Sequence, residues 1–402
     1  MNAKRITVVT AGNLSTCPRM LKAADAFAGA GYRVHVVSTN TAAWAAEADK
    51  DITRSRTWNW SIVQSGRVMS GARFKLAQAL AATMDAPMPV AARAYSRLHD
   101  ELQRDIMARP ADLIYGGTTG ALAAVAEAGR RLQTPYAIDF EDFHSGEHTG
   151  PGSELTNALA AKVEADVLAQ ARFVTAGSPM IAEEYAARYG VRPLTIHNTF
   201  SAVIPVKGEL PEGPLRLYWF SQTLGPQRGL EDVIRAAGQS GAAVELHLRA
   251  RTVPAYLESL RAMQAAVAPA LRLIMHDPAS PDAMVTLAQP YDAGLACEEP
   301  YVLNRRLCLT NKIFTYLAAG VPMLLSRTPA QARLEPELGD AAFGYACGDV
   351  QGLAAILRRL AADRALRCRG RAAARDAAAR RWHWEHPADR GALLDAVRGA
   401  FA

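Results

Sequence analysis

Short apolar runs alternate along the chain with longer stretches in which apolar residues recur every three or four positions. The first run, residues 6–10, has Ile6, Val8 and Val9 and no charged residue, which predicts a strand buried on both faces. Pro18 then suits the first turn of a helix, whose periodicity ends at Gly29 and Gly31, and residues 34–38 form the next apolar run. This alternation is typical of βαβ units, which build a parallel sheet.

The same pattern continues through the first half of the chain and begins again in the second half. In the first half it predicts further strands near residues 112–115, 136–138, 173–175 and 194–197. In the second half it predicts helices from Leu230 and near 282–289 and 311–319, and strands at 215–220, 244–248, 271–275, 292–296 and 321–326. We therefore expect two doubly wound α/β domains.

A segment without periodicity separates these two series. Residues 199–214 hold three prolines and two glycines, which is typical of a linker. We predict an N-terminal domain at 1–198, the linker at 199–214, a C-terminal domain at 215–381 and a terminal segment at 382–402. Open α/β sheets bind ligands beyond the carboxyl ends of their strands. The site is therefore expected in the cleft between the two domains.

Positive charge is concentrated in one stretch. The net charge is +6, and residues 358–381 hold nine arginines against two aspartates, so the rest of the chain is close to neutral. Such a stretch favours a solvated helical face, and attraction to anionic lipid is the alternative. Attraction to nucleic acid has no motif to support it, and we expect no nucleic-acid partner.

The remaining composition bears on the compartment. Five cysteines form no C-x-x-C pair, so neither a disulfide framework nor a zinc site is indicated, and we expect a cytoplasmic protein. No apolar run approaches the about 18 residues of a membrane span.

Residues 66–109 are helical by composition. Their cations are interleaved with Met and Ala: Arg67, Arg73, Lys75, Arg93 and Arg97. This segment either packs on the domain as an ordinary surface helix or lies on the inner face of a membrane.

Two loops in the second domain carry residues suited to a nucleotide. The loop after residues 215–220 brings Arg228 and Gly229 to the start of a helix, where a guanidinium and free N–H groups suit a pyrophosphate. The alternative is that Arg228 only caps a surface loop. The loop after 292–296 supplies carboxylates for ribose hydroxyls, and the next helix opens with a polar pair. These residues are Glu298, Glu299, Asn311 and Lys312.

We expect Lys312 to lie near Arg228 in the doubly wound arrangement, whereas the apolar residues that follow it, Phe314, Tyr316 and Leu317, are expected in the core.

In the first domain, polar side chains follow the strand predicted at 136–138. They are Asp139, Glu141, Asp142 and His144. They suit acceptor hydroxyls, while capping of a helix and a divalent metal are the alternatives. The loop after the first strand presents Asn13 and Leu14 to the expected cleft. Arg19 would reach an anionic acceptor or form a surface salt bridge.

Several classes of protein lack the motifs they need. There is no G-x-G-x-x-G for a nicotinamide or flavin, no P-loop, and no spaced hydrolase triad. His197 and Asn198 are expected to hold the hinge by hydrogen bonds. Trp382 and Trp384 are expected to pack the last helix rather than to stack on a ligand.

The segment NKIFTYLAAGVPMLLS, at 311–326, resembles the donor-site helix of retaining glycosyltransferases of the family-4 type, in which an Asn–Lys pair and an EYLAAG-x-P run are usual. The loop before Leu230 is similar to that family's G-R-L-x-x-x-K-G-L phosphate loop. The resemblance extends over nearly the whole chain, and it implies that residues 382–402 are a terminal helix that returns to the first domain. It implies the GT-B architecture, in which two Rossmann-like parallel-sheet domains face each other across a cleft.

The resemblance also implies a hexosyltransferase that needs no metal and no cofactor. Its donor would be a nucleotide-sugar, and its acceptor a hydroxyl on a glycan, a lipid-linked molecule or a small molecule. The expected donor-binding residues are Gln222, Thr223, Arg228, Gly229, Glu298, Glu299, Asn311, Lys312 and Thr315. The expected catalytic residues are His144, Asp142, Arg228 and Lys312, and the expected acceptor-binding residues are Asn13, Leu14, Arg19, Asp139 and Glu141.

Three positions depart from the family pattern. The family's acidic ribose ligand falls at Thr315, its phosphate-binding arginine falls near Thr223, and Arg228 replaces its usual lysine. Two other functions therefore stay open. One is a degenerate subunit that binds a nucleotide or a partner transferase without transferring sugar. The other is a nucleotide-sugar epimerase, with Glu141 and Glu299 as its acid and base.

Overall fold

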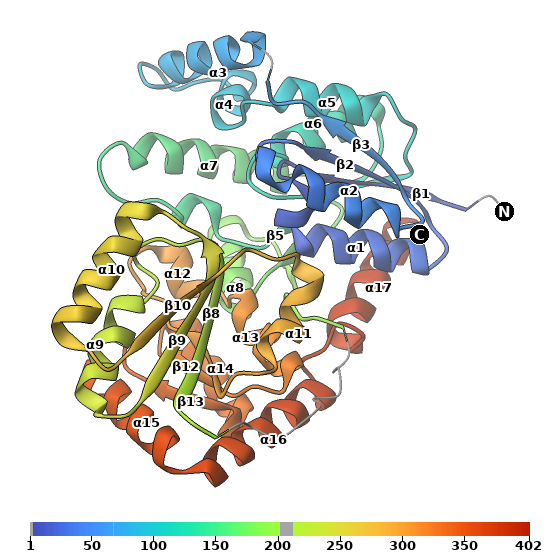
Figure 1. Ribbon diagram of the computed structural model, residues 1–402. Helices are drawn as coiled ribbons and strands as arrows, with labels where there is room; N and C mark the ends of the chain where they lie inside the picture. Colours follow the sequence, from blue (N-terminus) through green and yellow to red (C-terminus); the bar gives the residue numbers. More distant parts are fainter. Residues whose placement is uncertain (1–2, 67, 202–211) are drawn as a thin grey trace. The chain divides into compact units, whose positions relative to one another are not determined.

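The computed structural model describes residues 3–66, 68–201 and 212–402, and these form two compact units (Figure 1). The N-terminal unit consists of Met1–His197, Val302–Asn304 and Pro387–Ala402, and the C-terminal unit of Asn198–Tyr301 and Arg305–His386. Most of the predicted linker, residues 202–211, lies outside the described residues, as does Arg67.

The sheet of the N-terminal unit is parallel, with the strand order β3-β2-β1-β4-β5-β6-β7. Its strands are β1 Arg5–Thr10, β2 Arg33–Thr39, β3 Asn59–Val63, β4 Leu113–Gly117, β5 Tyr136–Phe140, β6 Val174–Ala176 and β7 Leu194–Thr195. Ile6 of β1 pairs with Val34 of β2 on one side and with Leu113 of β4 on the other, so β1 is an inner strand. This position explains why every residue from Ile6 to Thr10 is buried. Sequence reasoning missed β3, an edge strand whose residues are mostly half-buried.

The helices of this unit are α1 Pro18–Gly29, α2 Ala46–Arg54, α3 Val68–Ala81, α4 Met88–Tyr95, α5 His99–Met107, α6 Leu122–Leu132, α7 Ser153–Leu168, α8 Pro179–Tyr189 and α17 Ala392–Ala400. The segment predicted to be helical at 66–109 is therefore three helices. Pro87, with its restricted backbone, is the N-cap of α4, which ends before the extended residue Ser96. At the end of the chain, α17 contacts α1.

The sheet of the C-terminal unit has the order β10-β9-β8-β11-β12-β13 and is also parallel. Its strands are β8 Leu215–Thr223, β9 Val244–Arg251, β10 Arg272–His276, β11 Ala293–Ala296, β12 Met323–Ser326 and β13 Ala342–Tyr345. The strand order reverses between β8 and β11, which makes the carboxyl ends of these two strands the topological switch point where ligands bind in such sheets. The sequence pattern did not predict β13, a short edge strand.

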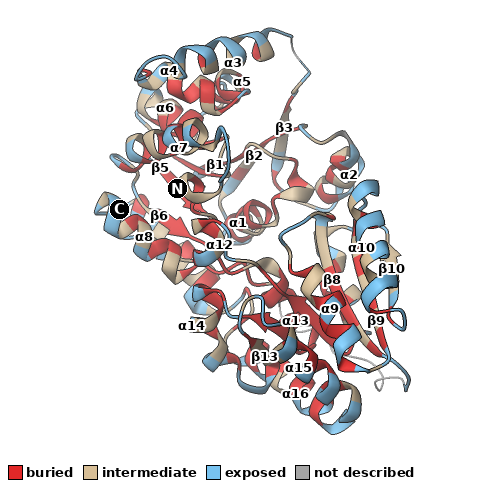
Figure 2. Cartoon of the chain, turned by 90° about the vertical axis from the view of Figure 1, so that its left-hand side faces the viewer, coloured by how far each residue is buried: buried red, intermediate tan, exposed pale blue. Residues whose placement is uncertain are grey.

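The helices in the second half of the chain are α9 Leu230–Ser240, α10 Pro254–Val267, α11 Met284–Ala288, α12 Leu303–Leu307, α13 Asn311–Ala319, α14 Pro329–Leu338, α15 Val350–Ala362 and α16 Arg364–Arg380. Phe314, Tyr316 and Leu317 of α13 are fully buried, as predicted. Trp382 is buried as well, with its ring centroid 5.6 Å from that of Phe314, and Trp384 is also buried. Figure 2 shows the buried inner sides of these elements.

The arginine-rich stretch is only partly the solvated face that its sequence favoured. Arg367 and Arg371 are buried and donate to backbone carbonyl groups. Arg371 binds the carbonyl oxygens of Tyr291 at 2.8 Å and Gln289 at 3.0 Å. A buried carbonyl group needs a hydrogen-bond donor, and these guanidinium groups point into the protein and supply it.

All five cysteines are free. No helix in the described part of the chain combines the length and the apolar character that a bilayer crossing requires.

The close approach of Tyr316 to β11 gives a test of the packing in the C-terminal unit. A Cβ atom at Gly294 would lie 2.4 Å from the ring of Tyr316, whose hydroxyl is held by the Tyr218 carbonyl at 2.9 Å. We expect Gly294→Ala to lower the free energy of unfolding by about 1–3 kcal/mol, as overpacked core substitutions do. Chemical denaturation measures this effect.

Gly399→Ala is the matched control, because nothing lies within 4 Å of its added Cβ atom. Since Gly399 is in helix α17, alanine there should stabilise the protein by up to about 1 kcal/mol. Equal stability of Gly294→Ala and the wild type would contradict the packing described.

Candidate functional site

Four charged side chains of the C-terminal unit gather where β8 and β11 end. The Glu298 carboxylate accepts from Lys312 Nζ at 2.6 Å and from Arg305 Nη1 at 3.3 Å. Arg228 Nη1 lies 3.7 Å from the same carboxylate. Lys312 and Arg228 therefore meet at one residue, as expected from the doubly wound arrangement. Three cations surround one anion, so the cluster carries an excess of positive charge.

Burial sets the character of this cluster. Glu298 is only 2% exposed, and burial alone would raise the pKa of its carboxyl group. Lys312, Arg305 and Arg228 outweigh that effect and hold the pKa of Glu298 below its usual range. Burial lowers the pKa of Lys312, and the Glu298 carboxylate opposes that shift. Lys312 and Glu298 thus form the buried part of the cluster. Arg228 and Arg305 are about a quarter and a fifth exposed, so they can reach a ligand.

The loop before α9 has a backbone that only glycine tolerates at one point. Gly229, the N-cap of α9, has φ = +68°, and a Cβ atom there would lie 2.3 Å from the carbonyl oxygen of Cys297. Its N–H group donates to Glu299 Oε1 at 3.2 Å. The Glu299 carboxylate therefore already accepts a hydrogen bond from one N–H group at the start of α9, where the helix dipole favours an anion. The pKa of Glu299 is raised, mainly by burial.

The remaining residues that were expected to bind the nucleotide-sugar donor differ in how accessible they are to a ligand. Thr315 is fully buried, and its hydroxyl donates to the carbonyl of Asn311 at 2.9 Å. The position of the family's acidic ribose ligand therefore faces the interior of the unit. Asn311 also accepts through its side chain from Asn198 Nδ2 at 2.5 Å. Gln222 is exposed, and Thr223 is partly buried at a bulge, in register with Arg251.

Glu298 was expected as a possible replacement for the missing ribose ligand. The structure shows it buried and engaged by cations instead, so its oxygens are committed within the unit. Glu299 is half-buried and is the more accessible of the two carboxylates.

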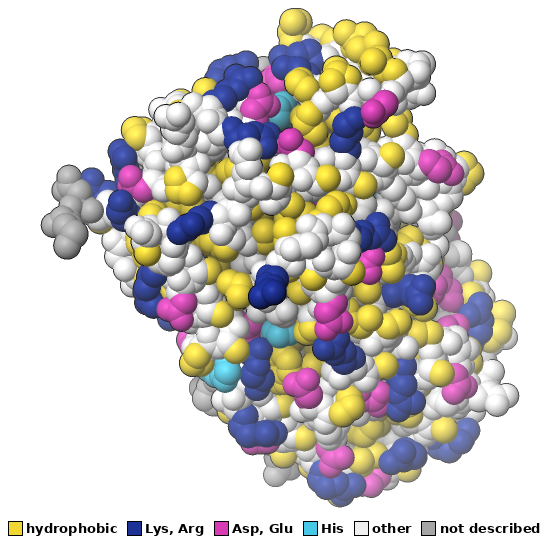
Figure 3. Space-filling model, turned by 180° about the vertical axis from the view of Figure 1, so that it is seen from behind, with side chains coloured by type: hydrophobic (Ala, Val, Ile, Leu, Met, Phe, Trp, Pro, Cys, Tyr) yellow, Lys and Arg dark blue, Asp and Glu magenta, His cyan; other side chains and the backbone are white. Residues whose placement is uncertain are grey.

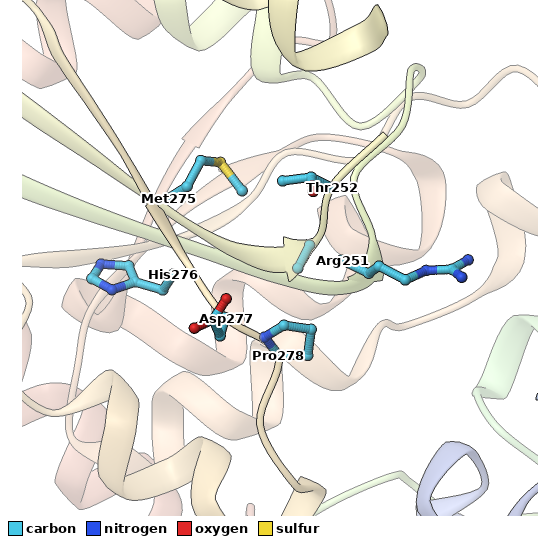
Figure 4. Close-up of a pocket in the computed structure, with 7 residues that line it drawn as sticks. Arg251, Thr252, Met275, His276, Asp277 and Pro278 are labelled. Atoms are coloured by element: carbon cyan, nitrogen blue, oxygen red, sulfur yellow. The ribbon is translucent and has the colours of Figure 1, made fainter. Parts of the chain in front are cut away.

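Sequence reasoning did not find a cavity of about 360 Å³ at the carboxyl ends of β9 and β10. It is lined by Ala250, Arg251, Thr252, Met275, His276, Asp277 and Pro278 (Figure 4). The Arg251 side chain extends away from the other labelled residues in this view. Burial and Arg249 lower the pKa of His276, which favours its neutral form at pH 7. The sequence held one indication of this cavity, because its lining residues lie at the ends of two predicted strands.

In the N-terminal unit, Arg19 and Asp139 form a buried ion pair. Arg19 donates to the two oxygens of the Asp139 carboxylate from Nε at 2.6 Å and from Nη2 at 2.7 Å. Asp139 also accepts from the Thr175 hydroxyl, and Arg19 donates to the Ile196 carbonyl. The surface salt bridge expected for Arg19 is thus an internal one, and Asp139 contacts protein groups rather than facing solvent. Two charges can stay buried here because each satisfies the other.

The loop after β1 is also internal. Asn13 is buried, donates to the Asp49 carboxylate at 2.8 Å and accepts from the Ala42 N–H at 2.8 Å. Leu14 is fully buried. These contacts give both residues a role in holding the loop, which differs from the exposed position expected for acceptor-binding residues.

His144 is one of several buried residues of this unit with a side-chain atom that makes no hydrogen bond among the described residues. Its Nδ1 lies 2.8 Å from Glu147 Oε1 and 3.2 Å from Thr119 Oγ1. Its Nε2 is buried and has no partner among the described residues, and the Tyr95 hydroxyl is in the same situation. Burial alone would lower the pKa of His144, but Glu147 raises it to about 8. An imidazolium at neutral pH therefore holds one N–H donor free for a ligand.

The carboxylates beside His144 are differently placed. Asp142 accepts from Asn304 Nδ2 at 2.9 Å, and Asn304 Oδ1 accepts from the Phe143 N–H at 2.9 Å. Burial, followed by the neighbouring Asp142 carboxylate, raises the pKa of Glu141 to about 7. The end of β5 thus combines one protonated histidine with a carboxyl group that titrates near neutral pH.

The two residues at the predicted hinge are both buried and hydrogen-bonded. His197 Nδ1 lies 3.0 Å from Asp389 Oδ1, which also accepts the His197 N–H at 2.7 Å. Asn198 donates to Asn311, as described above.

The comparisons with known proteins agree with this architecture. Residues 18–199 match the family model described as a glycosyl transferase 4-like domain. A search among curated proteins finds no match.

Three solved structures illustrate the likeness of the fold. HepE from Anabaena, in complex with UDP and glucose, is 16% identical, with a TM-score of 0.70 and 98% of each chain covered. A glycosyltransferase from Rickettsia africae is 11% identical with a TM-score of 0.67, covering 100% of this chain and 98% of the other. Sucrose-phosphate synthase from Thermosynechococcus elongatus is 14% identical with a TM-score of 0.67, covering 99% and 100%. The two parallel-sheet units therefore have the GT-B glycosyltransferase fold, as predicted.

The His144–Glu147 pair predicts a specific dependence of stability on pH. A pKa of about 8 for His144 in the folded state exceeds the ordinary histidine value of 6.5, so the pair stabilises the fold below pH 6.5 and loses its effect as the pH rises through about 8. We expect Glu147→Gln to lower the free energy of unfolding at pH 6 by about 2 kcal/mol, with a smaller deficit at pH 9. Urea denaturation at the two pH values measures both numbers.

Glu154→Gln, at an exposed carboxylate in the first turn of α7, is the control. A deficit of Glu147→Gln that is the same at pH 6 and pH 9, or that Glu154→Gln reproduces, would refute the pairing.

Proposed function

We propose that this protein transfers a hexose from a nucleotide-sugar donor to an acceptor hydroxyl, with retention of the anomeric configuration. The observation that carries the proposal is the convergence of Lys312, Arg305 and Arg228 on the single buried carboxylate of Glu298 at the switch point of the C-terminal sheet. An unneutralised positive cluster at the start of a helix suits the diphosphate of such a donor.

The same unit offers a place for the nucleoside. Strand β9 is next to β8 and β10 follows it, and neighbouring strands lie about 4.8 Å apart, so the cavity at their ends is within the length of a nucleoside from the cluster. HepE, which shares the fold, was solved with UDP and with UDP-glucose. We therefore take UDP-sugars as the first donors to test.

Such a transfer is achieved by positioning and electrostatics. Arg228 and Arg305 stabilise the negative charge that develops on the departing diphosphate, and each preorganised donor of this kind contributes a few kcal/mol to lowering the barrier. Buried Lys312 and Glu298 keep the two guanidinium groups in place. In the N-terminal unit, the free Nε2–H of His144 and the Tyr95 hydroxyl orient hydroxyl groups of the sugar or the acceptor. The donor phosphate itself takes the acceptor proton, so no protein nucleophile is required.

One observation favours a second candidate. Because Thr315 faces the interior, the family's acidic ribose contact has no equivalent at that position. A subunit that binds a nucleotide without transferring sugar would tolerate this loss. Glu299, which is half-buried, is the residue that would restore a ribose contact in an active enzyme.

The donor site is tested by nucleotide-induced stabilisation. A ligand that binds the folded state raises the melting temperature by mass action, so we expect one of UDP, GDP, ADP or CMP, or its sugar, to do so for the wild type. Arg228→Ala should abolish most of this shift. Arg235→Ala, on α9 and paired with Asp232, removes an equal charge from the same unit and should retain it.

Turnover separates the two candidates. Release of the nucleoside diphosphate from the donor, with transfer or hydrolysis of the sugar, identifies a transferase. Stabilisation by a nucleotide without any release supports the non-transferring subunit. An altered sugar on an intact nucleotide would point to an epimerase, and the absence of any nucleotide effect would remove the donor site altogether.

A further inference from the structure

Helix α3 of the N-terminal unit has an apolar outer face. Its exposed residues include Val68, Met69, Leu76 and Leu80, which are 85%, 69%, 63% and 40% exposed. Ala72 and Ala79 are exposed as well, and Lys75 is the charged residue among them. A surface helix ordinarily presents polar side chains to water. The outer side of α3 is pale blue in Figure 2, and Figure 3 shows hydrophobic side chains gathered along the edge where α3 lies.

The opposite face of the same helix is already used by the fold. Ala77 is buried in a cluster with Ala91 and Ala94 of α4 and Leu159 of α7. The exposed residues are therefore not needed for packing within the unit. Met84, just after the helix, extends the exposed apolar surface and is 52% exposed.

Charge identifies the kind of surface that this face fits. Residues 66–84 contain Arg67, Arg73 and Lys75 and no aspartate or glutamate. Among the described residues, no carboxylate lies within ion-pair distance of Lys75, and Arg97 and Arg104 nearby are also exposed and without such a partner. Arg73 is engaged internally by Asp100. Apolar side chains framed by unpaired cations are typical of helices that lie in the headgroup region of anionic bilayers.

We propose that the outer face of α3, with Met69, Leu76 and Leu80 inserted and Lys75 at its border, docks on an anionic lipid bilayer. A second copy of the chain fits less well, because a two-fold interface would set the same cationic patch against itself. The helix lies flat on the surface, in keeping with its length and with its contacts to α4.

The position of α3 connects this surface to the acceptor residues. Helix α4 packs on α3 and ends at Tyr95, whose buried hydroxyl has no hydrogen-bond partner among the described residues. The docked face therefore lies on the helix pair that leads to His144 and Thr119. Resting on the proposed function, this arrangement favours a lipid-linked acceptor, whose hydroxyl would be presented from the bilayer surface.

Vesicle co-sedimentation tests the docking surface without requiring turnover. Full-length protein is mixed with vesicles of phosphatidylcholine alone or of phosphatidylcholine with phosphatidylglycerol. We expect binding to the anionic vesicles, and a loss of about tenfold or more in affinity for the double variant Leu76→Ser, Leu80→Ser. Lys75→Glu should weaken binding to a smaller extent and only to the anionic vesicles.

The matched control is Val253→Ser with Val267→Ser, which changes two exposed apolar residues of the C-terminal unit, 39% and 46% exposed. Retained binding by this control and an unchanged melting temperature of the α3 variant show that the effect is local. Failure of the wild type to bind anionic vesicles, or equal binding by the α3 variant, overturns the proposal. A dimer in solution that the α3 variant dissociates also overturns it, in favour of self-association.

The outcome is distinguishable from that of the proposed function. Nucleotide-induced stabilisation reports on the C-terminal unit and should be the same in the α3 variant and the wild type. Vesicle binding without nucleotide binding would leave the docking surface standing and remove the transferase.

Discussion

A charged group can be buried only if opposite charge and hydrogen bonds replace the water it loses. The C-terminal unit depends on this constraint at Glu298, which lies at the point where the strand order reverses. Lys312 and Arg305 compensate its charge directly, and Arg228 approaches from the loop after β8. The cluster thereby joins the loops of two neighbouring strands, and it carries an excess of positive charge. In the proposed function, the side chains that neutralise Glu298 would also bind the anionic donor.

The N-terminal unit meets the same requirement differently. Arg19 and Asp139 neutralise each other completely, so this pair stabilises the ends of α1 and β5 and leaves little charge for a ligand. His144 is protonated through Glu147 and retains one unused N–H donor. The Arg19–Asp139 pair uses its charges within the protein and holds the unit together. The His144–Glu147 pair keeps one N–H group without a partner among the described residues, which suits an acceptor. Four of the expected acceptor residues, Asn13, Leu14, Arg19 and Asp139, are buried.

The fold also accounts for the departure at Thr315. Its hydroxyl bonds to the preceding turn of α13, which is a common use of threonine inside a helix. The helix is otherwise buried and intact, and its start still carries Lys312 in contact with Glu298. The proposed donor site therefore keeps the contact between Lys312 and Glu298, whereas the position of the family's acidic ribose ligand is buried.

The sequence by itself determined the two parallel-sheet domains. Inner strands are buried on both faces and are therefore rich in apolar residues, and the helices between them carry an apolar residue every three or four positions. It also predicted the loops that carry Arg228, Glu298 and Lys312, since ligands bind where such strands end. Strands β3 and β13 escaped prediction because short edge strands carry mixed residues. Only the tertiary structure decided the directions of long charged side chains. Arg371 donates to the carbonyl of Tyr291, 80 positions away, and Arg19 to Asp139, 120 positions away, and no local pattern encodes such partners.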